Sequence, residues 1–170
     1  MIRTLPACAL FLSVLAPAIH AQQASVPDAM PFDVPYGQSI TVARAAQVVQ
    51  AVVAEASRTP RNWKLAIAVV DPSGDLVYFY RMDQTQVASV EVAMRKARTS
   101  ARFRRPTQAF FDAMQAAGGS IIPTLTPDLV ASPGGIPLIE GGRLIGAIGC
   151  SGATSAQDAV ACQAGANTIR

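Results

Sequence analysis

Apolar and polar residues follow two different periods in the first half of the chain, and each period predicts one type of element. Between residues 39 and 60 the apolar side chains recur every three or four positions, which predicts a helix that ends near Pro60. The segments "KLAIAVVD" (64–71) and "DLVYFYRM" (75–82) are rich in strand-forming residues, and the short "PSG" between them indicates a hairpin.

The middle of the chain is expected to form two further helices and a long loop. One helix covers about 88–103, and a short one begins at Pro106-Thr107. Residues 118–135, "GGSIIPTLTPDLVASPGG", show no clear periodicity and contain several prolines and glycines. A loop of this length is often a binding loop or a lid, and an ordered crossing stretch without a special role explains the pattern equally well.

The last third of the chain predicts a second hairpin and a final helix. "IPLIE" and "RLIGAIGC" are expected to be strands around Gly141-Gly142, a pair that suits a tight turn. The helix begins at about 154, where Thr154 and Gln157 match a capping box. The full order, α-β-β-α-α-β-β-α, predicts an α+β fold in which an antiparallel sheet is flanked by helices.

The N-terminal part of the chain is expected to lie outside this domain. Arg3 precedes an uncharged apolar run over 5–18, which predicts a secretory signal peptide that spans 1–21 and does not serve as a membrane span. Residues 22–38 contain three prolines and predict an extended arm or linker, and the domain itself occupies 39–170. We therefore expect the mature protein to be periplasmic or secreted.

Removal of the predicted signal peptide would also remove His20, the only histidine of the chain. A mature chain without imidazole excludes Ser-His-Asp and Cys-His catalysis, His-ligated zinc and a histidine ligand to haem. A hydrolase that uses Ser151 of "GCSGA" would lack a base, so it is the least favoured function. The sequence therefore favours a protein that binds a partner molecule over an independent enzyme.

Two cysteines, Cys150 and Cys162, follow the predicted signal peptide. An even number of cysteines in an oxidising compartment permits a disulfide. If Cys150 stands just before the last helix, Cys162 should lie about 12 Å along the helix axis at 1.5 Å per residue. Bridged cysteines need Cα atoms within about 7 Å. We therefore expect two buried cysteines without a bond between them.

The stretch "RKARTSARFRR" (95–105) is the most basic part of the chain. One face of the predicted helix carries small or apolar residues and should pack on the core: Val90, Ala93, Ala97 and Ala101. A second face carries Glu91 four residues before Arg95, a spacing that favours an exposed ion pair. The net charge is only +3 and aromatic residues are few, so we do not expect a nucleic-acid partner.

A third face of the same helix gathers Val92, Lys96, Thr99 and Phe103, with one lysine among apolar and hydroxyl groups. Lys96 could contact the carboxylate of a ligand or a neighbouring subunit. It could equally extend its ammonium group to water without any special role.

Two further places offer groups that could bind a ligand. At the end of the second predicted strand, Tyr80 can ligate haem iron, and Arg81 can bind a propionate or form a surface pair with Asp83. Near the start of the last helix, Ser151 to Thr154 could present backbone N–H groups to an anion, or simply begin a capped helix.

Four blocks of the sequence resemble, in order and spacing, the GlcG/HbpS family, also called the haem-degrading domain family. They are "AIAVVDPSGDLVYFYRMD", "SVEVAMRKARTSARFRRPT", "GGIPL" and "IGAIGCSGATSAQDAVACQAGA", and the resemblance runs from about Thr41 to Ala166. Lys96 to Ser100 match the family's "KA-x-T-A" block. "RMDQT" replaces the commoner "RMDGA", so Gln84 stands where the family has glycine and could alter the loop after Asp83.

The resemblance implies a profilin-like or PAS-like fold, a homo-oligomer and a haem ligand. It suggests an exported haem-binding protein in which Lys96 and Arg81 contact the propionates and Thr99 or Tyr80 lies near the iron. Slow haem breakdown or redox sensing would follow from the bound haem. The alternative is a periplasmic accessory protein that binds a small anionic molecule during hydroxy-acid or alcohol oxidation, without haem.

Overall fold

The computed structural model describes residues 28–30, 32–116 and 118–169. The predicted signal peptide, His20 and the first part of the predicted arm lie outside these residues. Within the described ranges, no helix combines the length and apolar character needed to cross a membrane.

The centre of the domain is a four-stranded antiparallel sheet. Its strands are β1 (Ala66–Val70), β2 (Leu76–Arg81), β3 (Gly135–Glu140) and β4 (Arg143–Ser151). They lie in the order β2-β1-β4-β3, so both predicted hairpins form and pair through β1 and β4. The antiparallel sheet confirms the predicted fold class.

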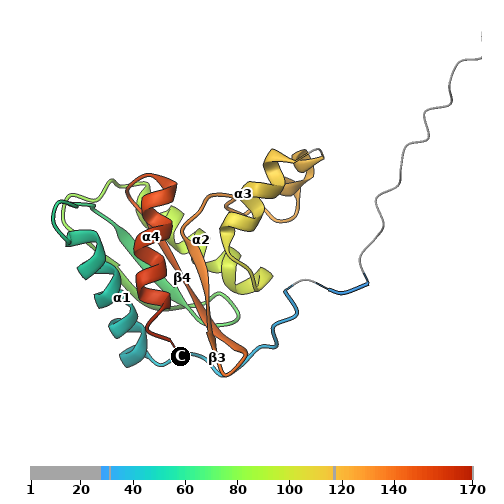
Figure 1. Cartoon of the computed structure of the whole chain (residues 1–170), viewed down its shortest axis with the longest axis horizontal. Coiled ribbons are helices and arrows are strands. Elements are labelled where there is room, and N and C mark those ends of the chain that lie inside the picture. The colour runs from blue at the N-terminus through green and yellow to red at the C-terminus, as the bar shows by residue number, and fades with distance from the viewer. Residues whose placement is uncertain (1–27, 31, 117, 170) are drawn as a thin grey trace, which may run out of the picture. The chain divides into compact units, whose positions relative to one another are not determined.

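Helices cover both faces of this sheet (Figure 1). The helices α1 (Val42–Ser57) and α4 (Ser155–Ala166) lie on one face, and α2 (Ser89–Phe103) lies on the other. The short α3 (Thr107–Gln115) follows α2, and the loop predicted over 118–135 begins with the 3₁₀ helix η1 (Gly119–Thr124). The observed order of helices and strands is the predicted one.

The two faces of β1 differ in side-chain size, and this sets how closely the helices approach. Ile67 and Val69 pack toward α1 and α4, whereas alanines of β1 face α2. Ala93 and Ala97 of α2 come so near the sheet that a Cβ on Gly149 would lie 2.1 Å from the Ala93 carbonyl oxygen. The small-residue face predicted for α2 is therefore confirmed.

Two local sequence signals have the expected geometry. Gly141 and Gly142 adopt φ of 54° and 74°, which the primed hairpin turn requires. Thr154 Oγ1 accepts a hydrogen bond from the Gln157 amide at 3.4 Å, and Gln157 Oε1 accepts one from the Thr154 amide at 3.1 Å. The capping box is thus confirmed at the start of α4.

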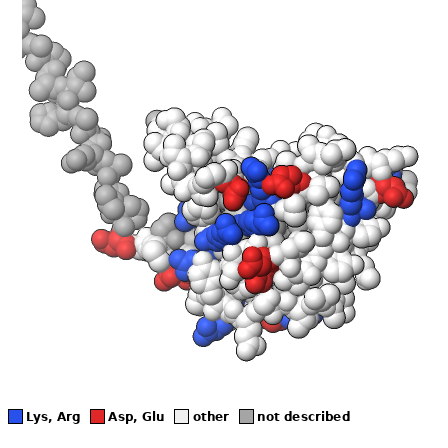
Figure 2. Space-filling model, turned by 180° about the vertical axis from the view of Figure 1, so that it is seen from behind, with Lys and Arg blue, Asp and Glu red and all other residues white. Residues whose placement is uncertain are grey.

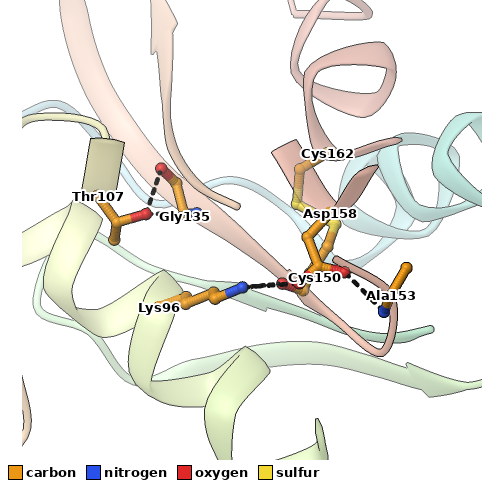
Figure 3. The surroundings of a disulfide bond; sticks show 7 residues. All are labelled: Lys96, Thr107, Gly135, Cys150, Ala153, Asp158 and Cys162. Atoms are coloured by element: carbon orange, nitrogen blue, oxygen red, sulfur yellow. Dashed lines mark hydrogen bonds and ion pairs between the residues drawn. A yellow bond between two sulfur atoms is a disulfide. The ribbon is translucent and has the colours of Figure 1, made fainter. Parts of the chain in front are cut away.

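Cys150 and Cys162 form a disulfide, so the prediction of two unpaired cysteines is wrong (Figure 3). Their Cα atoms lie 5.7 Å apart. The prediction considered only the separation of the two cysteines along the axis of the last helix. The chain instead turns after β4, with Gly152 at φ 148°, and α4 runs back over the strand. Cys162 therefore returns to Cys150 instead of moving away from it.

The described C-terminal part of the predicted arm, residues 32–38, contacts the domain of its own chain. The Leu144 amide donates to the Pro35 carbonyl at 2.9 Å, and the Gly37 amide donates to the Leu144 carbonyl at 2.7 Å. The Arg104 guanidinium lies over the Tyr36 ring, 5.4 Å from its centroid. These contacts extend the hydrogen bonding at the start of β4.

Candidate functional site

The five residues predicted to bind a ligand come from α2, from the end of β2 and from the end of β4. Lys96 and Ser151 belong to the region where α2 and α4 meet β4, whereas Thr99 and Phe103 face the segment after η1. Arg81 ends β2, at the edge of the sheet. Arg81 and Ser151 lie opposite the same residue, Ala66, on the two strands that flank β1.

Lys96 is buried and carries its own counter-charge. Its side chain is only 2% exposed, so the alternative in which its ammonium group extends to water is wrong. The Nζ atom donates to Asp158 Oδ2 at 2.8 Å and to the Cys150 carbonyl at 3.1 Å (Figure 3). A ligand carboxylate at Lys96 would have to replace Asp158. The role predicted for Lys96 in binding propionate stays a prediction.

The sequence builds this buried pair from three separate segments. Asp158 lies in the first turn of α4, where its Oδ1 accepts from the Ala153 amide at 3.0 Å. Gly134 leaves the necessary room, because a Cβ there would lie 3.0 Å from Lys96 Nζ. Burial raises the pKa of the Asp158 carboxyl, and the Lys96 ammonium opposes that rise. The pair ties α2 to α4 and to the end of β4.

Thr99 and Phe103 are occupied by contacts within the fold. Thr99 Oγ1 accepts a hydrogen bond from the Val130 amide at 3.1 Å, which fixes the loop after η1 on α2. The Phe103 ring meets the Phe110 ring edge to face, with centroids 5.0 Å apart. The hollow beside Thr99 and Phe103 measures only about 10 Å³. It has no room for haem in this conformation.

The basic run on α2 is largely a surface of mixed charge. Glu91 and Arg95 form the predicted ion pair, with 2.7 Å between Oε1 and Nε. Figure 2 shows acidic side chains among the basic ones on the face opposite to that of Figure 1.

Arg81 and Tyr80 point to opposite faces of the edge strand β2. The register pairs Tyr80 with Ile67, whose face packs on α1, and pairs Arg81 with Ala66, whose face packs on α2. Arg81 Nη2 donates to the Thr85 carbonyl at 2.8 Å. The predicted Arg81–Asp83 pair is absent from the salt bridges of the described residues.

An apolar groove of about 350 Å³ runs between α1 and β2. We call it the α1–β2 groove. Its strand side presents Tyr78 and Tyr80, and its helix side consists of Ala46, Val49, Gln50, Val53 and Ala54. None of these lining residues is charged. Tyr80 is 42% exposed, so its phenol is accessible from solvent. The volume falls within the usual range of small-molecule sites.

Sequence reasoning identified Tyr80 but missed the rest of this groove. Tyr78 could have been found, because residues two apart on a strand share a face. The helix side could not, since the position of α1 over β2 depends on packing between segments far apart in the sequence.

Gln84, in the loop after β2, adopts φ 63°, a left-handed conformation that glycine favours.

The α1–β2 groove offers apolar surface and a phenol oxygen, two of the features that a haem site needs. Haem needs apolar walls and a donor for its iron, and tyrosine serves as that donor in some haem proteins. Val53 and Ala54 supply accessible apolar surface, and the Tyr80 hydroxyl is open to a ligand. The other predicted iron donor, Thr99, is buried and already accepts a hydrogen bond. Tyr80 is therefore the better donor of the two.

Known proteins resemble this chain over most of its length. It is 36% identical over 122 residues to an uncharacterised 15.0 kDa protein from the dhaT-dhaS intergenic region of Citrobacter freundii, covering 71% of this chain and 84% of that protein. It is 34% identical over 107 residues to the protein GlcG of Escherichia coli K12, covering 62% of this chain and 78% of GlcG.

Solved structures share the fold. Klebsiella pneumoniae protein ORFY superposes with a TM-score of 0.72 at 26% identity, over 85% of this chain and 96% of that one. A complex of PduOC with haem gives a TM-score of 0.69 at 27% identity, over 78% and 96%. The family model for the haem-degrading protein HbpS-like matches residues 40–167. This protein therefore belongs to the HbpS-like family of haem-degrading proteins, as the resemblance of its sequence blocks predicted.

Proposed function

We propose that this protein is an exported, homo-oligomeric haem-binding protein and that haem binds in the α1–β2 groove. The observation that carries the proposal is an uncharged, apolar groove in which the exposed phenol of Tyr80 offers a donor to iron. The family match and the haem complex of a protein with the same fold support it.

The side chains of the groove divide into two roles. Val53 and Ala54 would contact the porphyrin and exclude water from that side of it. Tyr80 would hold the iron, and Tyr78 would contact the ring beside it. The propionates would face water, because no charged residue lines the groove. Bound haem would supply the redox chemistry of its iron, which includes its own slow breakdown in the presence of a reductant.

Exposed apolar side chains support the homo-oligomer. They lie on α3, on η1 and at its C-terminal end: Phe111, Met114, Ile121 and Leu125. Contiguous exposed apolar surface usually marks a contact with another molecule. Light scattering on the purified chain tests this part of the proposal, and a mass of about one chain would contradict it.

A hemin titration tests the proposed site, and the chain provides a matched set of variants in its three tyrosines. The wild-type chain should give a saturable shift of the Soret band. Tyr80→Phe removes the oxygen proposed to ligate the iron and should weaken hemin binding at least about tenfold, a loss of about 1.4 kcal/mol or more. Tyr36→Phe removes a hydroxyl outside the groove and should bind hemin as the wild type does.

Two outcomes would contradict the proposal. A wild-type chain without a saturable Soret shift would exclude haem binding and would favour the accessory role in hydroxy-acid or alcohol oxidation. Equal affinity of Tyr80→Phe and Tyr36→Phe would exclude Tyr80 as the iron donor.

A further inference from the structure

A second hollow, of about 570 Å³, differs from the α1–β2 groove in its polar lining. We call it the polar cleft. The arm contributes Tyr36 to its walls, and the start of the domain contributes Ser39. The turn between β1 and β2 contributes Asp71, and α2 contributes Arg102. Two opposite charges therefore share one cleft.

Arg102 is oriented so that part of its guanidinium remains available. Its Nε donates to the Ser73 carbonyl at 3.1 Å. Gly74 permits this approach, because a Cβ at that position would lie 2.9 Å from Nε. Within the described ranges, neither Nη atom takes part in a hydrogen bond or salt bridge. The two Nη groups form the planar edge that binds a carboxylate with two parallel hydrogen bonds.

Asp71 shows the complementary arrangement. Its Oδ1 accepts from the amides of Ser73 and Asp75 at 2.8 and 2.9 Å, which holds the turn. Its Oδ2 accepts no hydrogen bond from a described residue. Asp71 and Arg102 do not form one of the salt bridges between described residues, so their charges do not neutralise each other at contact distance.

We propose that the polar cleft binds a small zwitterion of the size of an amino acid or a dipeptide. The ligand carboxylate would lie on the Nη edge of Arg102, and its ammonium group on Oδ2 of Asp71. A ligand with only a carboxylate would be repelled by Asp71, and one with only an ammonium group would be repelled by Arg102. This inference does not depend on the proposed haem site, because the two hollows share no lining residue.

A titration with three related peptides, followed by the amide signals of the isotope-labelled chain, tests the proposal. L-alanyl-L-alanine should give saturable shifts at residues 36–39 and 71–75. N-acetyl-L-alanyl-L-alanine lacks the ammonium group, and L-alanyl-L-alanine amide lacks the carboxylate. Each should bind at least about tenfold more weakly, since each loses a charge-assisted hydrogen bond.

Variants of the two charged residues identify the site. Asp71→Asn keeps an acceptor for the turn amides, and Arg102→Gln removes the planar edge, so each should lower affinity for the dipeptide at least about tenfold. Arg95→Gln changes an exposed arginine of α2 outside the cleft and should leave affinity unchanged. The absence of saturable shifts at about 10 mM dipeptide, well above a weak dissociation constant of roughly 1 mM, would overturn the proposal. Equal binding of the acetylated peptide would also overturn it.

Discussion

Replacement of Lys96 by methionine tests the buried ion pair that joins α2 to α4. Methionine has nearly the volume of lysine, so the change removes the ammonium group and leaves little cavity. Asp158 would keep its hydrogen bond from the Ala153 amide at 3.0 Å but would lose its counter-charge. The variant therefore isolates the electrostatic part of the pair.

The expected loss in free energy of unfolding is about 3 kcal/mol. Removal of one partner from a buried ion pair usually costs about 3–5 kcal/mol. We expect a value near the lower end of this range, because the Asp158 carboxylate keeps its hydrogen bond from the Ala153 amide. Small domains have a total stability of about 5–15 kcal/mol, so Lys96→Met should remain folded with a clearly lower stability.

Urea denaturation measures the effect, and Arg95→Met provides the control. Arg95 is the neighbouring residue on α2, and its pair with Glu91 is solvent-exposed, so its loss should cost no more than about 0.5 kcal/mol. The double variant Lys96→Met, Asp158→Asn removes both charges and should be more stable than Lys96→Met alone. A Lys96→Met loss equal to that of Arg95→Met would refute the reasoning.

The effect of Lys96→Met should depend on pH. Burial already raises the pKa of Asp158, and loss of the opposing ammonium should raise it further. A carboxyl with a raised folded-state pKa contributes stability that is fully present below its unfolded pKa of about 3.9 and is lost as pH rises through the folded value. The variant should therefore come closer to the wild type near pH 4 than at pH 7. An equal difference at both pH values would contradict this cause.

Two further changes test other features of the fold. Cys150→Ala with Cys162→Ala opens a loop of sequence separation 12 and should lower the free energy of unfolding by about 3 kcal/mol in chemical denaturation; a loss below about 1 kcal/mol would show that the disulfide adds little. Gln84→Gly relieves a left-handed backbone conformation and should raise the free energy of unfolding by up to about 1 kcal/mol, which a slight rise in melting temperature would show. A fall in melting temperature would instead show that the Gln84 side chain stabilises the loop.

The sequence predicted those features that depend on neighbouring residues. The period of apolar positions located α1 and α2, and the Thr154–Gln157 pair located the start of α4, because each signal lies within one or two turns. Helical periodicity also separated the core face of α2 around Ala97 from its exposed face around Arg95, because helix geometry alone determines which residues share a face.

The features that sequence reasoning missed depend on how distant segments meet. Lys96 and Asp158 are 62 residues apart, and neither residue type indicates the other as its partner. The disulfide required knowledge that α4 reverses over β4. Tyr80 was identified from its chemistry, but the apolar groove around it arises only when α1 packs beside the edge strand.

A crystal structure of the chain with bound hemin would test the central claim most directly. We expect the porphyrin between α1 and β2, with the Tyr80 oxygen as the protein ligand to iron and the Lys96–Asp158 pair intact. A porphyrin bound beside Lys96 or Thr99, with that pair broken, would contradict the proposed site and would favour the residues predicted from the sequence alone.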